Sequence, residues 1–160
     1  MTKLKWGMIG GGEGSQIGPA HRLGAQADAR FEMVAGALDH RADAGRDYAQ
    51  RLGIAADRAY GDWQEMLSGE KGRADRVDLV TVATPNATHY EITREFLKAG
   101  FYVLCEKPMT MTVEEGEAIV EIAKKTGNIC AVNYDYSCYT LERHMEAMIA
   151  RGDIGKFRLV

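Results

Sequence analysis

The sequence is short of the residues that mark several large classes of protein. Its 160 residues include 3 prolines and 3 cysteines, and its longest stretch without Asp, Glu, Lys or Arg (79–90) has 12 residues. A membrane-spanning helix needs about 20 apolar residues. The odd cysteine count, without metal-binding spacing, argues against a disulfide framework or a zinc site. We therefore expect a reduced, cytoplasmic protein with no membrane segment and no metal.

The sequence also has no excess of positive charge. The net charge is −3, from 20 basic and 23 acidic residues, and both halves of the chain are close to neutral. No basic face or tail is visible, so nucleic acid is not an expected partner. With 46% hydrophobic residues the chain can form an ordinary core, and its length predicts one domain.

Apolar runs alternate with helical segments along the chain. Such alternation, with helices of 10–15 residues, is typical of βαβ units and a parallel sheet. The expected strands are 4–9, 31–38, 77–83, 101–105, 129–134 and a last one beginning at 157–160. The expected helices are 19–25, 41–52, 62–67, 86–99, 112–126 and 141–150. The predicted fold class is α/β.

Helix ends are marked by capping residues. Asp62 with Glu65, and Thr112 with Glu115, have the spacing of capping pairs. Asn86, directly after Pro85, is expected to cap the helix that follows the third strand.

Glycine is concentrated at the start of the chain, where 6 of its 18 copies occur within the first 18 residues. They lie between a predicted strand and a predicted helix, the layout that places backbone N–H groups against a pyrophosphate. Gly10 and Gly12 fit the G-x-G-x-x-G pattern, but Ser15 occupies the third position and Gly18 follows three residues later. We interpret this as a lengthened loop in which Ser15, Gln16 and Ile17 offer N–H groups to phosphate. A tight turn without a ligand is the alternative.

Asp39 follows the second strand, 21 residues after Gly18. A carboxylate at about this distance from the loop accepts hydrogen bonds from ribose hydroxyls and would repel a 2′-phosphate, which favours NAD. Arg41 keeps NADP as an alternative cofactor, because its guanidinium could bind the 2′-phosphate. Asp39 could instead cap the next helix.

Polar residues follow three further strands, and in a parallel sheet these strand ends share one edge. They are Thr84, Pro85 and Asn86; Glu106, Lys107 and Pro108; and Asn133. Lys107 could stabilise a developing alkoxide, and Glu106 could bind a ribose hydroxyl or tune the lysine. A solvated surface pair is the alternative for both.

Four histidines remain to be placed. His89 follows Asn86 and is expected on the nicotinamide side of the cleft, with an ordinary helix-start histidine as the alternative. His21, His40 and His144 are expected to be structural or solvated.

The chain resembles the Gfo/Idh/MocA oxidoreductases along its whole length. The matching motifs are the glycine loop with His21, Thr84-Pro85-Asn86 with His89, Glu106-Lys107-Pro108, Asn133-Tyr134 and Gly152-Asp153-Ile154-Gly155. The resemblance implies a doubly wound Rossmann-type parallel sheet in three αβα layers. It also implies a cofactor, NAD or alternatively NADP, bound by the strand-end residues 84–86, 89, 106, 107 and 133, together with the loop, Asp39 and Arg41.

The resemblance further implies hydride transfer between nicotinamide and a sugar, a polyol or a related hydroxyl compound, with Lys107 as the catalytic lysine. The family's acid/base histidine, four residues after an aspartate in a second α/β domain, has no match here. We therefore expect residues 1–151 to be an NAD(P)-binding domain and 152–160 to begin the connection to an absent substrate domain. As a full-length protein it is expected to be a homo-oligomer.

We expect this chain to bind cofactor without efficient turnover. The alternative is a natural single-domain NAD(P)-sensing module, which a stop codon directly after residue 160 would favour. An epimerase or lyase that uses NAD as a redox relay also fits the family.

Overall fold

The structure is a computed structural model that describes residues 2–27, 29–156 and 158. Five parallel strands form one sheet in the order β2-β1-β3-β4-β5. The strands are β1 (Leu4–Gly10), β2 (Phe31–Ala37), β3 (Leu79–Ala83), β4 (Tyr102–Glu106) and β5 (Cys130–Asn133). The predicted parallel α/β sheet is confirmed; most of the sixth expected strand (157–160) lies outside the described residues.

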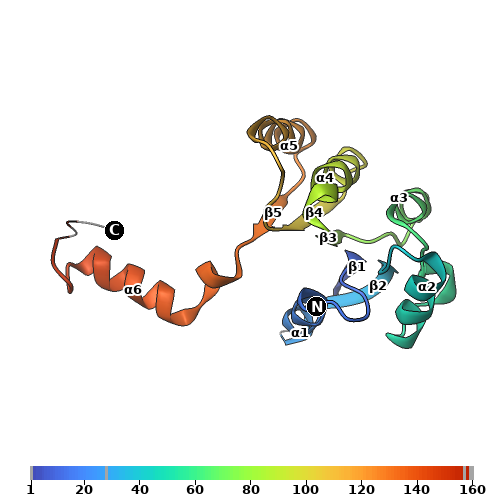
Figure 1. The fold of residues 1–160 in the computed structure, drawn as a ribbon, viewed down its shortest axis with the longest axis horizontal. Coiled ribbons are helices and arrows are strands. Elements are labelled where there is room, and N and C mark those ends of the chain that lie inside the picture. Colours follow the sequence, from blue (N-terminus) through green and yellow to red (C-terminus); the bar gives the residue numbers. More distant parts are fainter. Residues whose placement is uncertain (1, 28, 157, 159–160) are drawn as a thin grey trace.

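Helices cover both faces of this sheet. They are α1 (Ile17–Ala27), α2 (Ala42–Arg51), α3 (Trp63–Lys71), α4 (His89–Lys98), α5 (Val113–Thr126) and α6 (Thr140–Arg151). Figure 1 shows α1 on one face and α4 and α5 on the other, whereas α6 extends away from the sheet. The strand order reverses between β1 and β3, so the crevice for a ligand is expected at their carboxyl ends.

Both predicted capping pairs are confirmed. The Glu65 N–H donates to Asp62 Oδ1 at 2.7 Å, and the Glu115 N–H donates to Thr112 Oγ1 at 3.2 Å. Each glutamate also reaches back across the helix start, since Glu65 accepts from the Gly61 N–H and Glu115 from the Met111 N–H. These bonds satisfy N–H groups that the first helical turn leaves unpaired.

The predicted cap at Asn86 is wrong. Asn86–Thr88 forms a short 3₁₀ turn, and α4 begins only at His89. Pro85 is extended, and its carbonyl accepts from both the N–H and the hydroxyl of Thr88, at 3.0 and 2.7 Å. Asn86 thus belongs to the turn between β3 and α4, where it is exposed, and does not cap α4.

Two apolar clusters lie against the sheet. The larger contains Val80, Val82 and Val103 together with Phe96 from α4 and Ile119 from α5. The smaller contains Trp6, Met8 and Leu38, and the Trp6 indole donates to Thr81 Oγ1 at 2.8 Å. Because the central strands carry apolar side chains, the polar residues gather at the carboxyl edge.

Candidate functional site

A cleft of about 590 Å³ lies at the carboxyl ends of β1, β2 and β3, at the point where the strand order reverses. Five residues predicted for the site line it, namely Gly10, Ser15, Asp39, Thr84 and Pro85. They come from three separate loops, so only the parallel sheet brings them together. The position is the one at which open α/β sheets bind ligands.

The glycine loop is packed too tightly for side chains. A Cβ on Gly12 would lie 2.1 Å from the Leu38 carbonyl oxygen, and one on Gly18 would lie 2.0 Å from the Gly11 carbonyl oxygen. Gly18 is the second residue of α1, so its missing side chain lets the helix start lie against the loop. In the dinucleotide-binding pattern the third glycine provides close packing of this kind.

Ser15 has a different role from the one predicted. Its N–H donates to the Gly12 carbonyl at 3.1 Å, and its hydroxyl oxygen accepts from the Gly18 N–H at 3.1 Å. The Ser15 N–H is therefore used within the loop and is not free for a phosphate. Ile17 begins α1, and the first N–H groups of a helix have no acceptor within it. The helix start thus still presents a partial positive charge to an anion.

Gly18→Ala and Gly24→Ala form a matched pair within α1. Apart from the chain neighbours of Gly24 and the backbone of α1, no atom of the described residues lies within 4 Å of a Cβ on Gly24. Its replacement should therefore leave cofactor affinity unchanged and add up to about 1 kcal/mol of stability. Gly18→Ala must displace the loop, and we expect it to weaken NADH binding at least about tenfold. NADH fluorescence titration and urea unfolding measure both effects. Equal affinities of the two variants would contradict the packing argument.

Asp39 follows β2 and is bonded to Arg41. Its Oδ1 accepts from the Arg41 N–H at 2.8 Å and from Nε at 3.2 Å, and its Oδ2 accepts from Nη2 at 3.2 Å. These hydrogen bonds lower the pKa of the Asp39 carboxyl to about 2. The N-cap residue of α2 is Arg41, and its side chain makes no capping hydrogen bond. Asp39 is therefore not the N-cap residue, although it accepts from the Arg41 N–H just before the helix.

Some residues of the cleft were missed by the sequence analysis. They are Ile9, Gly11, Ala37, Leu38, His40, Asp62, Trp63, Ala83, Thr88 and Ile92. Asp62 and Trp63 follow no strand, and their only sequence signal is a helix start. They reach the cleft because α3 begins near the end of β2, which spacing along the chain does not show.

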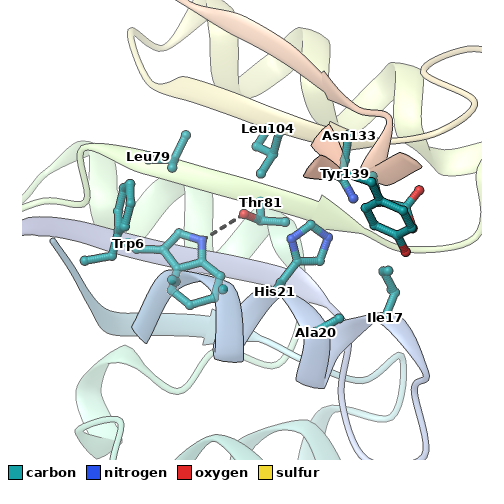
Figure 2. Close-up of a pocket in the computed structure, with 13 residues that line it drawn as sticks. Trp6, Ile17, Ala20, His21, Leu79, Thr81, Leu104, Asn133 and Tyr139 are labelled. Carbon is teal, nitrogen blue, oxygen red and sulfur yellow. Dashed lines mark hydrogen bonds between the residues drawn. The ribbon is translucent and has the colours of Figure 1, made fainter. Parts of the chain in front are cut away.

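Glu106, at the carboxyl end of β4, is enclosed by the side chains of His21 and Asn133. Its Oε1 lies 2.8 Å from His21 Nε2 and accepts from Asn133 Nδ2 at 2.7 Å. His21 and Asn133 line a neighbouring cavity of about 470 Å³, shown in Figure 2. Because Oε1 has two partners and Glu106 is 7% exposed, little of this carboxylate faces solvent. Of the two expected roles for His21, structural or solvated, its 8% exposed side chain fits the structural one.

His89 lies below the cleft surface. It is 1% exposed, with Nδ1 2.7 Å from the Pro108 carbonyl oxygen and Nε2 2.8 Å from the Thr84 carbonyl oxygen. The expectation that it faces the nicotinamide side therefore needs correction, because neither ring nitrogen is left for a ligand. Lys107, by contrast, is exposed, and its peptide bond to Pro108 is cis.

Within residues 2–27, 29–156 and 158, no helix is long and apolar enough to cross a membrane. The same residues contain no group of three or more His, Cys, Asp or Glu side chains that could hold a metal ion.

Known proteins share this arrangement. The family described as "Oxidoreductase family, NAD-binding Rossmann fold" matches residues 4–134. The chain therefore belongs to the Gfo/Idh/MocA oxidoreductase family, as the strand-end motifs indicated.

Individual relatives agree with this assignment. An inositol dehydrogenase homolog from Azotobacter vinelandii, solved with NADH and myo-inositol, is 42% identical with a TM-score of 0.95, over 98% of this chain and 41% of that one. The uncharacterized oxidoreductase YfiI of Bacillus subtilis is 44% identical over 98% of this chain and 40% of its own length. D-xylose 1-dehydrogenase (NADP(+)) of Hypocrea jecorina is 32% identical over 95% of this chain and 39% of its own length. The chain thus spans about two fifths of these relatives.

Proposed function

We propose that this chain binds NAD(H) in the 590 Å³ cleft and contributes Lys107 to an oxidoreductase that acts on a CH–OH group of a sugar, a polyol or a related hydroxyl compound. The observation that carries the proposal is the convergence of the packed glycine loop and Asp39 on one cleft, with α1 beginning two residues after Ser15 of that loop. The names of the relatives, which include sugar and polyol dehydrogenases, support the substrate class.

The residues present fit a dinucleotide. The start of α1 offers the Ile17 N–H and the helix dipole to the pyrophosphate, because the Gly18 N–H donates to Ser15 and Pro19 has no N–H. The glycine positions that a Cβ would block leave room for a close approach. Asp39, ionised at neutral pH, suits two ribose hydroxyls as hydrogen-bond donors. Arg41 is paired with Asp39, which favours NAD over NADP. Thr84, Pro85 and Asn86 are assigned to the remaining cofactor contacts. The Glu106 carboxylate and the Asn133 amide, also expected to bind cofactor, bond to each other in this structure.

Lys107 is the proposed catalytic residue. Bound nicotinamide would accept or return a hydride at the carbon of the reacting alcohol. The Lys107 ammonium would donate a hydrogen bond to the substrate oxygen, orient it and stabilise the negative charge that develops there. We place the acid/base residue and most substrate contacts outside these 160 residues, so that residues 1–151 serve as the NAD(P)-binding domain.

Cofactor titration tests this function directly. NADH added to the chain should give saturable binding by fluorescence or calorimetry, whereas NAD⁺ with myo-inositol or D-xylose should give no steady formation of NADH. Absence of saturable binding even at millimolar cofactor would contradict the proposal. Efficient turnover would instead show that these residues suffice for the reaction. The cytoplasmic location and the homo-oligomer stay predictions.

A further inference from the structure

Two buried histidines hold the residues on either side of Lys107. His21 lies on α1 and contacts the Glu106 side chain, whereas His89 lies at the start of α4 and contacts the Pro108 carbonyl. The lysine is therefore the free residue between two fixed neighbours.

The contact before Lys107 joins three elements. Glu106 ends β4, its partner His21 lies one turn into α1 behind the glycine loop, and its partner Asn133 ends β5. Both partners meet the same oxygen, Oε1, at 2.8 and 2.7 Å, and the side chains of His21 and Glu106 are 8% and 9% exposed. The phosphate loop and the strand that carries the lysine are thus linked through one carboxylate.

The contact after Lys107 joins two loops. The His89 ring lies between the carbonyl oxygens of Thr84 and Pro108, at 2.8 and 2.7 Å. Thr84 belongs to the loop that lines the cofactor cleft, and Pro108 belongs to the turn that carries the lysine. A single imidazole therefore contacts both loops.

The side chain of Lys107 has no comparable support. In the part of the chain that the structure describes, its ammonium takes part in no hydrogen bond or ion pair, and the one bond of this residue runs from its backbone N–H to Glu106 Oε2 at 3.2 Å. The location of the ammonium therefore depends on the backbone, which is held at residues 106 and 108.

We propose that His21 and His89 are positioning residues for Lys107. They fix the lysine-bearing turn against the glycine loop and the Thr84 loop, so that the ammonium is directed to the same point relative to bound cofactor. This inference rests on the proposed role of Lys107. Displacements of about 1 Å at a reacting group can reduce rates about 100-fold, which gives such contacts functional weight.

The test compares His89→Phe, which keeps a ring but has no N–H, with His89→Gln, whose amide can donate to a carbonyl. His144→Phe, on the exposed side of α6, is the matched control. The readouts are the melting temperature, the NMR signals of the Lys107 amide and ε-carbon without cofactor, and NADH affinity. We expect His89→Phe to shift the Lys107 signals and to weaken NADH binding about tenfold. His89→Gln should restore part of the signals and of the affinity. His144→Phe should change neither the signals nor the affinity.

Unchanged Lys107 signals and NADH affinity in a folded His89→Phe variant would overturn the proposal. Should that variant not fold, His21→Leu and His21→Gln provide the same comparison through Glu106. The proposal is supported if His21→Leu shifts the Lys107 signals and His21→Gln restores them. It is overturned if the Lys107 signals are identical in these two variants. If the unaltered chain binds no NADH, the proposed function fails, whereas the Lys107 signals of the cofactor-free variants still decide the positioning role.

Discussion

Replacing Asp39 by serine is expected to reverse the preference of this protein between the two nicotinamide cofactors. The substitution removes the carboxylate that would accept hydrogen bonds from the ribose, and it releases the Arg41 guanidinium that this carboxylate holds at 3.2 Å. Hydrogen bonds to charged groups contribute about 1.5–3 kcal/mol, so NADH affinity should fall about 10- to 100-fold. NADPH affinity should rise, because the freed guanidinium can pair with a 2′-phosphate.

Parallel titrations of NADH and NADPH measure this effect. Asp43→Ser is the matched control, because Asp43 lies in the first turn of α2 and its side chain is fully exposed. Adding Arg41→Ala to Asp39→Ser should abolish the gain for NADPH. An unchanged ratio of NADH to NADPH affinity in Asp39→Ser would exclude Asp39 as the ribose partner.

The pH dependence of this preference follows from the lowered pKa of Asp39. With a pKa of about 2, the carboxyl is ionised throughout the neutral range. Its contribution to NADH binding should therefore stay constant from about pH 5 to pH 8 and disappear only as the pH falls towards the folded-state pKa. NADH titrations at several pH values check this, and a loss of preference above pH 5 would contradict the assignment.

Glu70→Ala is expected to cause the largest loss of stability. Glu70 is fully buried and accepts from Arg58 Nε at 2.9 Å, Arg58 Nη2 at 2.6 Å, the Tyr60 hydroxyl at 3.0 Å and the Val77 N–H at 2.9 Å. Its removal leaves a buried guanidinium without its main partner. Breaking a buried ion pair in this way costs about 3–5 kcal/mol, a large part of the stability of an ordinary domain.

Urea unfolding measures this loss against a surface control. Glu121→Ala removes an exposed ion pair with Lys124 on α5 and should change the free energy of unfolding by no more than about 0.5 kcal/mol. The double variant Arg58→Met with Glu70→Leu should recover part of the loss, because no unpaired charge remains in the core. A cost below about 1 kcal/mol for Glu70→Ala would show that water or rearrangement replaces these contacts.

Two of the cysteines have thiols that are hard to ionise. Burial raises the pKa of the Cys105 and Cys130 thiols to about 11, so few thiolates form near neutral pH.

Local patterns were enough to predict the elements and the edge of the sheet that carries the site. The apolar runs predicted the strands, the pairs Asp62–Glu65 and Thr112–Glu115 predicted two helix starts, and the glycine cluster predicted the loop between β1 and α1, because each signal lies within a few residues. Asn86 was misjudged because the turn after Pro85 competes with the helix for the same residues.

Taken alone, the sequence determined that this chain forms a parallel α/β sheet with a glycine loop and polar residues at its strand ends. The tertiary structure decided which of those residues remain available to a ligand. Asp39 and Thr84 line the cleft, whereas Glu106 is bonded to His21, 85 positions away. The two ring nitrogens of His89 lie 2.7 and 2.8 Å from two loop carbonyl oxygens. The physical reason is that a hydrogen bond depends on distance and direction in space. Partners so far apart in the chain meet only once the sheet has formed.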